Sequence, residues 1–315
     1  PRLEVGAAMA APGPAAGLVE LAPWMETDDP YALAATRLGA RSAGRMLVSD
    51  GLKALFLLRL QAALPTASWL LATPIVSPLR QAKDAEEIEL LREAAAAADR
   101  TVAGLVRGRL VGRTEADVAR EVKERLVAEG HDTAEFWIVG AGEDSASPHH
   151  DVSERVIRAG EPLLLDIGGR RLGYCSDITR TVWVRGADGA GPDETFRRIH
   201  GLVEAAQAAG RAAVRPGVAL QSLDRAARRI IDDAGYGDRF FHRLGHGIGL
   251  EVHEDPYVVE GNEALLAPGH TFSIEPGIYL EGRYGVRIED AVRCTEDGGE
   301  ALNTFERGLI EVSGI

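Results

Sequence analysis

Acidic residues interrupt several apolar stretches that are predicted to form strands. Asp166 directly follows Leu163–Leu165, and Asp177 opens the stretch DITRTVWV eleven residues later. Glu275 and Glu289 stand inside TFSIEPGIY and VRIEDAVR. Burying a charged side chain costs free energy unless another group compensates it. If these carboxylates converge, their mutual repulsion must be offset by protonation or by bound cations, and this requirement limits the folds available to the chain.

A histidine between two glycines completes the candidate cation site. His246 is flanked by Gly245 and Gly247, which allow the backbone to approach a centre closely. Oxygen-rich ligation with one imidazole suits two hard or borderline divalent ions, Mn²⁺, Co²⁺ or Zn²⁺, that share carboxylates. Cys175 is close to Asp177 in the sequence. We expect this cysteine to be a small buried residue, because a thiolate would select a softer metal.

The hydrophobic periodicity predicts an α+β fold. A long helix is expected from Asp84, and a second from Thr114, with Thr114 as the N-cap and Asp117 at position N3. Two more helices are expected at about 192–214 and 219–234. Strand-like stretches lie between the helices: EFWIVGAG, EPLLLDIGG, DITRTVWV, HTFSIEPGIYL and GVRIEDAVRC. Strands in runs with helices in pairs favour an antiparallel sheet over a repeat of parallel βαβ units.

The first part of the chain predicts a separate, small α/β unit. LVELAPWMETDDPYALAATRLG predicts a strand and a turn leading into a helix, and RMLVSD, GLKALFLLRLQAAL and SWLLATPI predict a strand, a helix and a strand. Because the long amphipathic helix begins at Asp84, we place the boundary between Lys83 and Asp84. The expected domains are therefore 1–83 and 84–315.

The composition excludes several classes of function. The 315 residues include 35 Lys and Arg against 48 Asp and Glu, and the net charge of −13 argues against nucleic acid and anionic membranes as partners. The apolar stretches are too short to cross a bilayer. Two cysteines cannot form a disulfide framework, so we expect a cytoplasmic location. The first residues show neither a signal peptide nor an initiating Met, which predicts a truncated chain.

Common catalytic motifs are absent from the sequence. It contains no GxSxG nucleophile motif and no GxxxxGK phosphate loop. GHGIGL has Leu250 where a dinucleotide-binding motif needs its last glycine. His253 and Glu254 do not begin an HExxH zinc helix, because Tyr257 occupies the second histidine position and Pro256 would break the helix.

The ordered motifs resemble those of a known family. DIGG followed by SDITRT, then HGIGLEVHEDP, SIEPGIY and VRIED, is similar to the series in the pita-bread metallopeptidases, within them the Xaa-Pro dipeptidase (prolidase) and aminopeptidase P branch. The resemblance covers nearly all of residues 84–315. It implies a pita-bread (creatinase/aminopeptidase) catalytic domain there and a smaller, partial creatinase-like domain at 1–83. It also implies a homodimer.

The resemblance implies a dinuclear metal site in the second domain. Its ligands would be Asp166, Asp177, His246, Glu275 and Glu289. Asp177 and Glu289 would bridge both ions, while Asp166 would complete one ion and His246 with Glu275 the other. We expect two divalent ions, most favourably Mn²⁺, with Co²⁺ or Zn²⁺ as alternatives.

The resemblance also implies residues around the substrate. His149 in SASPHH and His253 in EVHEDP match substrate-facing histidines, and Arg287 matches an arginine that precedes the bridging glutamate. We expect Glu275 to shuttle the water proton to the leaving nitrogen, His253 to hydrogen-bond the tetrahedral oxygen and His149 to orient the substrate. Arg287 could bind the free carboxylate of a terminal proline. The remaining histidines are expected to be structural: His131, His150, His200, His242 and His270.

The expected reaction is hydrolysis of the Xaa-Pro bond of a short peptide by hydroxide generated between two metal ions, with dipeptides as the preferred substrate. Several alternatives stay open: Xaa-Pro aminopeptidase, methionine aminopeptidase, metal-free hydrolysis in the manner of creatinase, and a non-catalytic pita-bread binding module. The intact ligand set argues against the last two. Taken singly, each carboxylate could instead be solvated or paired with a nearby arginine such as Arg170 or Arg180.

Overall fold

The structure, a computed structural model, describes residues 1–185 and 189–313 and divides into two compact units between Ser77 and Pro78. The sequence placed this boundary a few residues later, after Lys83. Lys83 belongs with the second unit because its Nζ lies 2.7 Å from Glu254 Oε1 and its backbone N–H donates to the carbonyl of Gly269 at 2.9 Å. Tertiary contacts, and not the start of the long helix, therefore separate the units.

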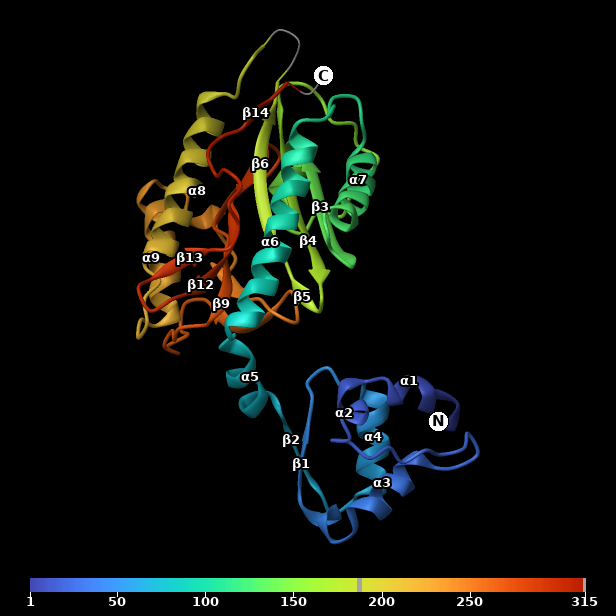
Figure 1. Cartoon of the computed structure of the whole chain (residues 1–315). Helices are drawn as coiled ribbons and strands as arrows, with labels where there is room; N and C mark the ends of the chain where they lie inside the picture. The colour runs from blue at the N-terminus through green and yellow to red at the C-terminus, as the bar shows by residue number, and fades with distance from the viewer. Residues whose placement is uncertain (186–188, 314–315) are drawn as a thin grey trace. The chain divides into compact units, whose positions relative to one another are not determined.

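The first unit contains a parallel β-α-β arrangement. Strands β1 (Arg45–Val48) and β2 (Ser68–Leu71) pair in parallel, and α4 (Ala54–Ala63) lies between them in the chain (Figure 1), as the sequence predicted. Shorter helical segments precede β1: η1 (Arg2–Glu4), α1 (Val5–Met9), α2 (Pro12–Ala15), α3 (Pro30–Leu38) and η2 (Gly39–Ala43). The strand expected before α3 does not form, because Pro23 has no N–H and no neighbouring strand pairs with this segment among the described residues.

A ten-stranded sheet forms the centre of the second unit. Its strand order is β3-β4-β6-β12-β9-β7-β8, while β5 pairs with β4, β13 with β12 and β14 with β6. Among the described strands of this sheet, only β14 and β6 pair in parallel. The strands of the sheet are β3 (Thr133–Ala141), β4 (Glu161–Arg171), β5 (Tyr174–Cys175), β6 (Ile178–Val184), β7 (Gly245–Gly247), β8 (Glu254–Val258), β9 (Thr271–Ile274), β12 (Glu289–Cys294), β13 (Gly299–Ala301) and β14 (Glu311–Val312). Strands β10 (Gly277–Leu280) and β11 (Tyr284–Arg287) form a separate pair.

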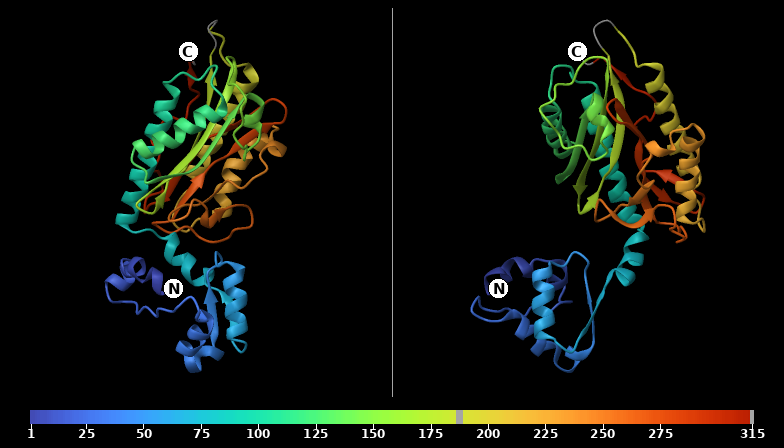
Figure 2. Two further views of the ribbon diagram at one scale, coloured as in Figure 1. Left: turned by 90° about the vertical axis from the view of Figure 1, so that its right-hand side faces the viewer. Right: turned by 180° about the vertical axis from the view of Figure 1, so that it is seen from behind.

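Two pairs of helices pack against different strands of this sheet (Figures 1 and 2). Helices α6 and α7 share an apolar core with β3, β4 and β6, whereas α8 and α9 share one with β9 and β12. Capping boxes begin α6 at Asp84 and α7 at Thr114, which confirms both predicted starts. The helical segments of this unit are α6 (Ala85–Val106), α7 (Glu115–Ala128), η3 (Gly142–Ala146), α8 (Glu194–Ala212), α9 (Leu220–Asp233) and η4 (Gly237–Arg239), after α5 (Thr73–Gln81).

Two stretches predicted as single strands are each divided in the structure. HTFSIEPGIYL forms β9 and β10, and GVRIEDAVRC forms β11 and β12. Pro276 cannot donate a ladder hydrogen bond, and β10 and β11 leave the large sheet to pair with each other. The divisions place Glu275 directly after β9 and Glu289 at the start of β12. Within the described ranges, no helix combines the length and the apolar character that crossing a membrane would require.

Candidate active site

A cavity of about 750 Å³ in the second unit collects the residues predicted to carry chemistry. Its wall includes every predicted metal ligand and every predicted substrate-facing residue: Asp166, Asp177, His246, Glu275, Glu289, His149, His253 and Arg287. These side chains come from stretches up to about half the chain apart, so the sheet has to bring them together.

The register of the sheet aligns two of the carboxylates, Asp166 and Glu289. Leu165 and Ile167 of β4 pack into the core under α6 and α7, so Asp166 between them faces the other side of the sheet. Thr179 of β6 is paired with Asp166 on one side and with Glu289 of β12 on the other. Its hydroxyl donates to Glu289 Oε2 at 2.6 Å.

The imidazole of His246 faces the carboxylates from β7. Its Nε2 lies 3.5 Å from Asp177 Oδ2, 3.3 Å from Glu275 Oε1 and 4.0 Å from Glu289 Oε1. Its Nδ1 lies 3.1 Å from the carbonyl oxygen of Gly247, which is the arrangement of an N–H donor. The Nε2 lone pair is therefore directed toward the acidic group.

The glycines on either side of His246 allow close packing between strands. A Cβ at Gly245 would lie 1.9 Å from the carbonyl oxygen of Ser273, and one at Gly247 would lie 2.3 Å from that of Asp255. Any larger residue would push β7 away from its neighbours. The sequence predicted close approach at these glycines, and the structure shows that neighbouring strands require it.

Burial and neighbouring charges shift the pKa values of four residues at the site. Burial, and then the neighbouring carboxylates, raise the pKa of Asp177 and of Glu289 well above their ordinary values. Burial raises the pKa of Glu275 to about 7. Burial, followed by the charge of His253, lowers the pKa of His246 to about 3, so this imidazole is neutral at pH 7.

The donor set fits divalent cations. Asp166 Oδ1, Asp177 Oδ1 and Glu289 Oε1 are buried and have no hydrogen-bond partner in the described part of the chain. One ligand atom each of Asp177, His246 and Glu289 lie within 4.8 Å of one another. Buried lone pairs without a partner are costly, and a cation would satisfy them while offsetting the repulsion. Arginines do not satisfy these three oxygens, because Arg287 bonds the other oxygen of Asp166, Oδ2, at 2.6 Å and Arg180 bonds Asp290 at 2.8 Å.

Comparison with known proteins identifies the family. Residues 89–296 match the model of metallopeptidase family M24. The chain belongs to this family. Its sequence is 44% identical over 313 residues to the Mycobacterium tuberculosis protein named "probable dipeptidase PepE", a match that covers 99% of this chain and 81% of the relative.

Solved structures agree with this assignment of family M24. Dipeptidase PepE from Mycobacterium ulcerans superposes with a TM-score of 0.92 at 43% identity, covering 99% of this chain and 82% of that one. Recombinant prolidase from Thermococcus sibiricus superposes with a TM-score of 0.91 at 35% identity, covering 99% and 83%. The predicted α+β pita-bread fold and the predicted class of enzyme, a metallopeptidase, are confirmed.

In this M24 chain, the guanidinium of Arg287 is hydrogen-bonded to other residues of the site. Its Nη2 lies 2.6 Å from Asp166 Oδ2 and 3.3 Å from the carbonyl oxygen of Pro148. Its Nη1 donates to the hydroxyl of Tyr279 at 2.8 Å, and its Nε donates to that of Thr179 at 3.2 Å. Every nitrogen of the guanidinium therefore has a protein partner, an arrangement that suits holding Asp166 in place.

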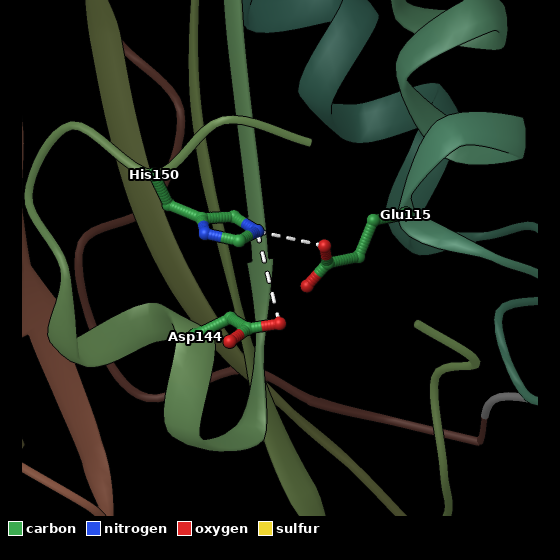
Figure 3. A group of neighbouring side chains, drawn as sticks. All are labelled: Glu115, Asp144 and His150. Carbon is green, nitrogen blue, oxygen red and sulfur yellow. Dashed lines mark hydrogen bonds and ion pairs between the residues drawn. The ribbon is translucent and has the colours of Figure 1, made fainter. Parts of the chain in front are cut away.

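The loop that carries His149 is anchored at the start of α7 (Figure 3). His150 Nε2 lies 2.8 Å from Glu115 Oε2 and 3.7 Å from Asp144 Oδ2. Glu115 also accepts bonds from the backbone N–H groups of Ala141 and Ser153 and from the Ser153 hydroxyl. Both carboxylate oxygens of Glu115 thus have partners. This group fastens the loop, and of the two adjacent histidines it is His149 that lines the cavity.

His242, which the sequence left as structural, belongs to a hydrogen-bonded chain that reaches Arg287. The hydroxyl of Tyr279 accepts from Arg287 and donates to His242 Nε2 at 3.0 Å, and His242 Nδ1 donates to the carbonyl of Arg243 at 2.8 Å. Burial lowers the pKa of His242 to about 3, which keeps the ring neutral. His242, Arg243 and Tyr257 also line the cavity. The one sequence signal that could have predicted these three cavity residues is their closeness to His246 and His253 along the chain.

Proposed function

We propose that this chain is a metal-dependent Xaa-Pro dipeptidase whose two divalent ions are held by Asp166, Asp177, His246, Glu275 and Glu289. The proposal rests above all on the buried carboxylate oxygens that lack a hydrogen-bond partner among the described residues and lie around a neutral imidazole. The similarity to proteins named dipeptidase and prolidase supports the same activity.

The nature of the donors favours Mn²⁺, with Co²⁺ or Zn²⁺ as alternatives, because four carboxylates and one imidazole are hard to borderline ligands. When bound, two such ions would activate water and polarise the scissile carbonyl. We assign the proton transfer to Glu275, because its carboxylate lines the cavity beside the candidate ligands, with Oε1 3.3 Å from His246 Nε2.

The histidines of the cavity are suited to contact the substrate. The ring of His253 meets that of His246 edge to face, with 4.1 Å between centroids. Burial, followed by the positive charge of Arg243, lowers the pKa of His253, so it is neutral at pH 7 and has one N–H to donate. We assign to His253 the hydrogen bond to the tetrahedral oxygen and to His149 the orientation of the substrate. The apolar side chains of Val252 and Val259 line the same cavity and suit a pyrrolidine ring.

The test combines metal removal with a peptide panel. We expect the chelated protein to be inactive and Mn²⁺ to restore cleavage of Ala-Pro, with little turnover of Ala-Ala. Asp177→Asn should lose bound metal and activity together, since it removes a ligand that the ions share. Cys175→Ser is the matched control: this thiol is buried, its pKa is raised to about 12, and it should not affect metal content. Full turnover after exhaustive chelation would overturn the proposal.

A further inference from the structure

The cavity holds one guanidinium that has no carboxylate partner. Arg243 and Arg287 are the arginines among the described residues that line it. The bonds of Arg287 to Asp166, Tyr279 and Thr179 engage all of its nitrogens. Arg243 makes no ion pair with any described residue, and its guanidinium lies over the ring of Tyr257, 4.6 Å from the centroid. Its donors are available to a ligand in the cavity.

The guanidinium of Arg243 lies in the same cavity as the candidate catalytic group. Arg243, His246, His253 and Glu275 all line this cavity. The side chain is half-buried, so its field is screened less than that of a surface arginine. Arg243 therefore places an uncompensated positive charge beside the site where peptide hydrolysis is proposed.

The backbone and the side chain of Arg243 are both held in place. The carbonyl of Arg243 accepts the Nδ1–H of His242, which is bonded through Tyr279 to Arg287. The ring of Tyr257 supports the guanidinium by a cation–π contact. A planar guanidinium held in this way loses little conformational entropy when it binds a carboxylate with two parallel hydrogen bonds.

We propose that Arg243 binds the free C-terminal carboxylate of the substrate and thereby sets a preference for dipeptides. This inference rests on the proposed function. A dipeptide would bring its carboxylate into a cavity that already holds several acidic groups, so binding requires a cation that is not yet paired. A tripeptide carries its carboxylate up to about 3.5 Å further along the chain and would not meet the same guanidinium. Arg243, and not Arg287, is then the residue that determines specificity.

Kinetics of substituted enzymes distinguish binding of the substrate carboxylate by Arg243 from the hydrolysis step. For the Mn²⁺-loaded wild type we expect kcat/KM for Ala-Pro to exceed that for alanyl-prolinamide and for Ala-Pro-Ala by at least about tenfold, the effect of one charge-assisted contact. Arg243→Met should lose at least tenfold on Ala-Pro and little on the amide, so that the preference disappears. Arg243→Lys should retain part of it. Arg225→Met, at an exposed arginine paired with Glu260 outside the cavity, should behave as wild type.

Calorimetry gives a readout independent of turnover. The reduced-bond analogue of Ala-Pro should bind the wild type at least tenfold more tightly than its carboxamide, and Arg243→Met should bind both equally while keeping its Mn²⁺. A preference for the acid that persists in Arg243→Met, or a wild type that favours the amide or the tripeptide, overturns the inference. If the wild type cleaves no Xaa-Pro substrate, the proposed function fails, and the analogue still decides whether Arg243 binds a carboxylate.

Discussion

At the scale of single residues, the raised pKa of Glu275 leads to a testable pH dependence of stability in the metal-free protein. Its pKa rises from an ordinary 4.5 to about 7 through burial, so between these values the folded, metal-free protein binds more protons than the unfolded chain. Stability from this group is therefore lost as the pH rises from about 4.5 to 7. We expect the melting temperature of the chelated wild type, relative to chelated Glu275→Gln, to fall over this range in a calorimetric pH series.

The comparison with Glu275→Gln is needed because histidines act in the opposite direction. The lowered pKa values of His242 and His246 make the folded protein gain stability as the pH rises toward 6.5. Both histidines are present in the two proteins, so their contribution largely cancels in the difference. A difference in melting temperature that does not change with pH would contradict the raised pKa of Glu275.

His253 provides a second prediction at this scale. His253→Ala should lower kcat by roughly 10²–10³-fold, the usual cost of removing one donor to a developing oxyanion. The bound metal should be retained, because His253 lies beside His246 without belonging to the candidate ligand set. Elemental analysis of the purified variant, run beside Asp177→Asn, checks this. Loss of metal from His253→Ala would instead make His253 a ligand.

At the scale of elements, hydrogen bonds from the first turn of α7 hold the loop that carries His149. The carboxylate of Glu115 is fully buried and accepts hydrogen bonds from Ala141, His150 and Ser153. Glu115→Gln keeps the shape of the side chain, but its amide NH₂ group would face the hydrogen-bond donors that the carboxylate now accepts from. We expect a loss of about 1–3 kcal/mol in the free energy of unfolding and a raised KM for Ala-Pro, with unchanged metal content.

An exposed residue of the same helix provides the control for this prediction. Glu124→Gln should leave both the stability and KM close to those of the wild type, because Glu124 is exposed on α7. Denaturant unfolding and steady-state kinetics measure the two quantities. If Glu115→Gln is destabilised but has a normal KM, Glu115 stabilises the fold without positioning His149.

At the scale of the whole molecule, metal binding and stability should be linked in the second unit. The acidic group lies entirely within Pro78–Ile315. An ion at a hundredfold excess over its dissociation constant adds about 2.7 kcal/mol to the stability of the unit that binds it. For a unit of this size, that corresponds to a rise of roughly 5–10 °C in melting temperature. Calorimetry with and without Mn²⁺ measures the shift, and Asp177→Asn should abolish it. An unshifted wild type would contradict tight binding at this site.

Some expectations for the whole molecule stay predictions. The homodimer and the cytoplasmic location were expected from the resemblance and from the cysteine content, and neither follows from the fold of one chain. The identity of the metal also stays a prediction, since the same oxygen and nitrogen donors accept more than one divalent ion.

Local features of the sequence determined much of this fold. The capping boxes at Asp84 and Thr114 and the apolar periodicity predicted where α6 and α7 begin, because these signals act over only three or four residues. The order of the motifs around Asp166, Asp177, His246, Glu275 and Glu289 predicted the family. Charged residues in apolar strands are costly wherever the strands lie, so their presence in the sequence is enough to indicate a site.

The tertiary structure alone decided which polar groups are paired and which are free. Arg287 is held by Asp166, a residue 121 positions away, and His150 is held by Glu115, 35 positions away. The spacing of residues along the chain contains no record of such contacts, because they depend on strand register and loop conformation. We predicted Arg287 as the substrate cation from the sequence, and only the structure shows that Arg287 is paired with Asp166 while the guanidinium of Arg243 lies over the ring of Tyr257.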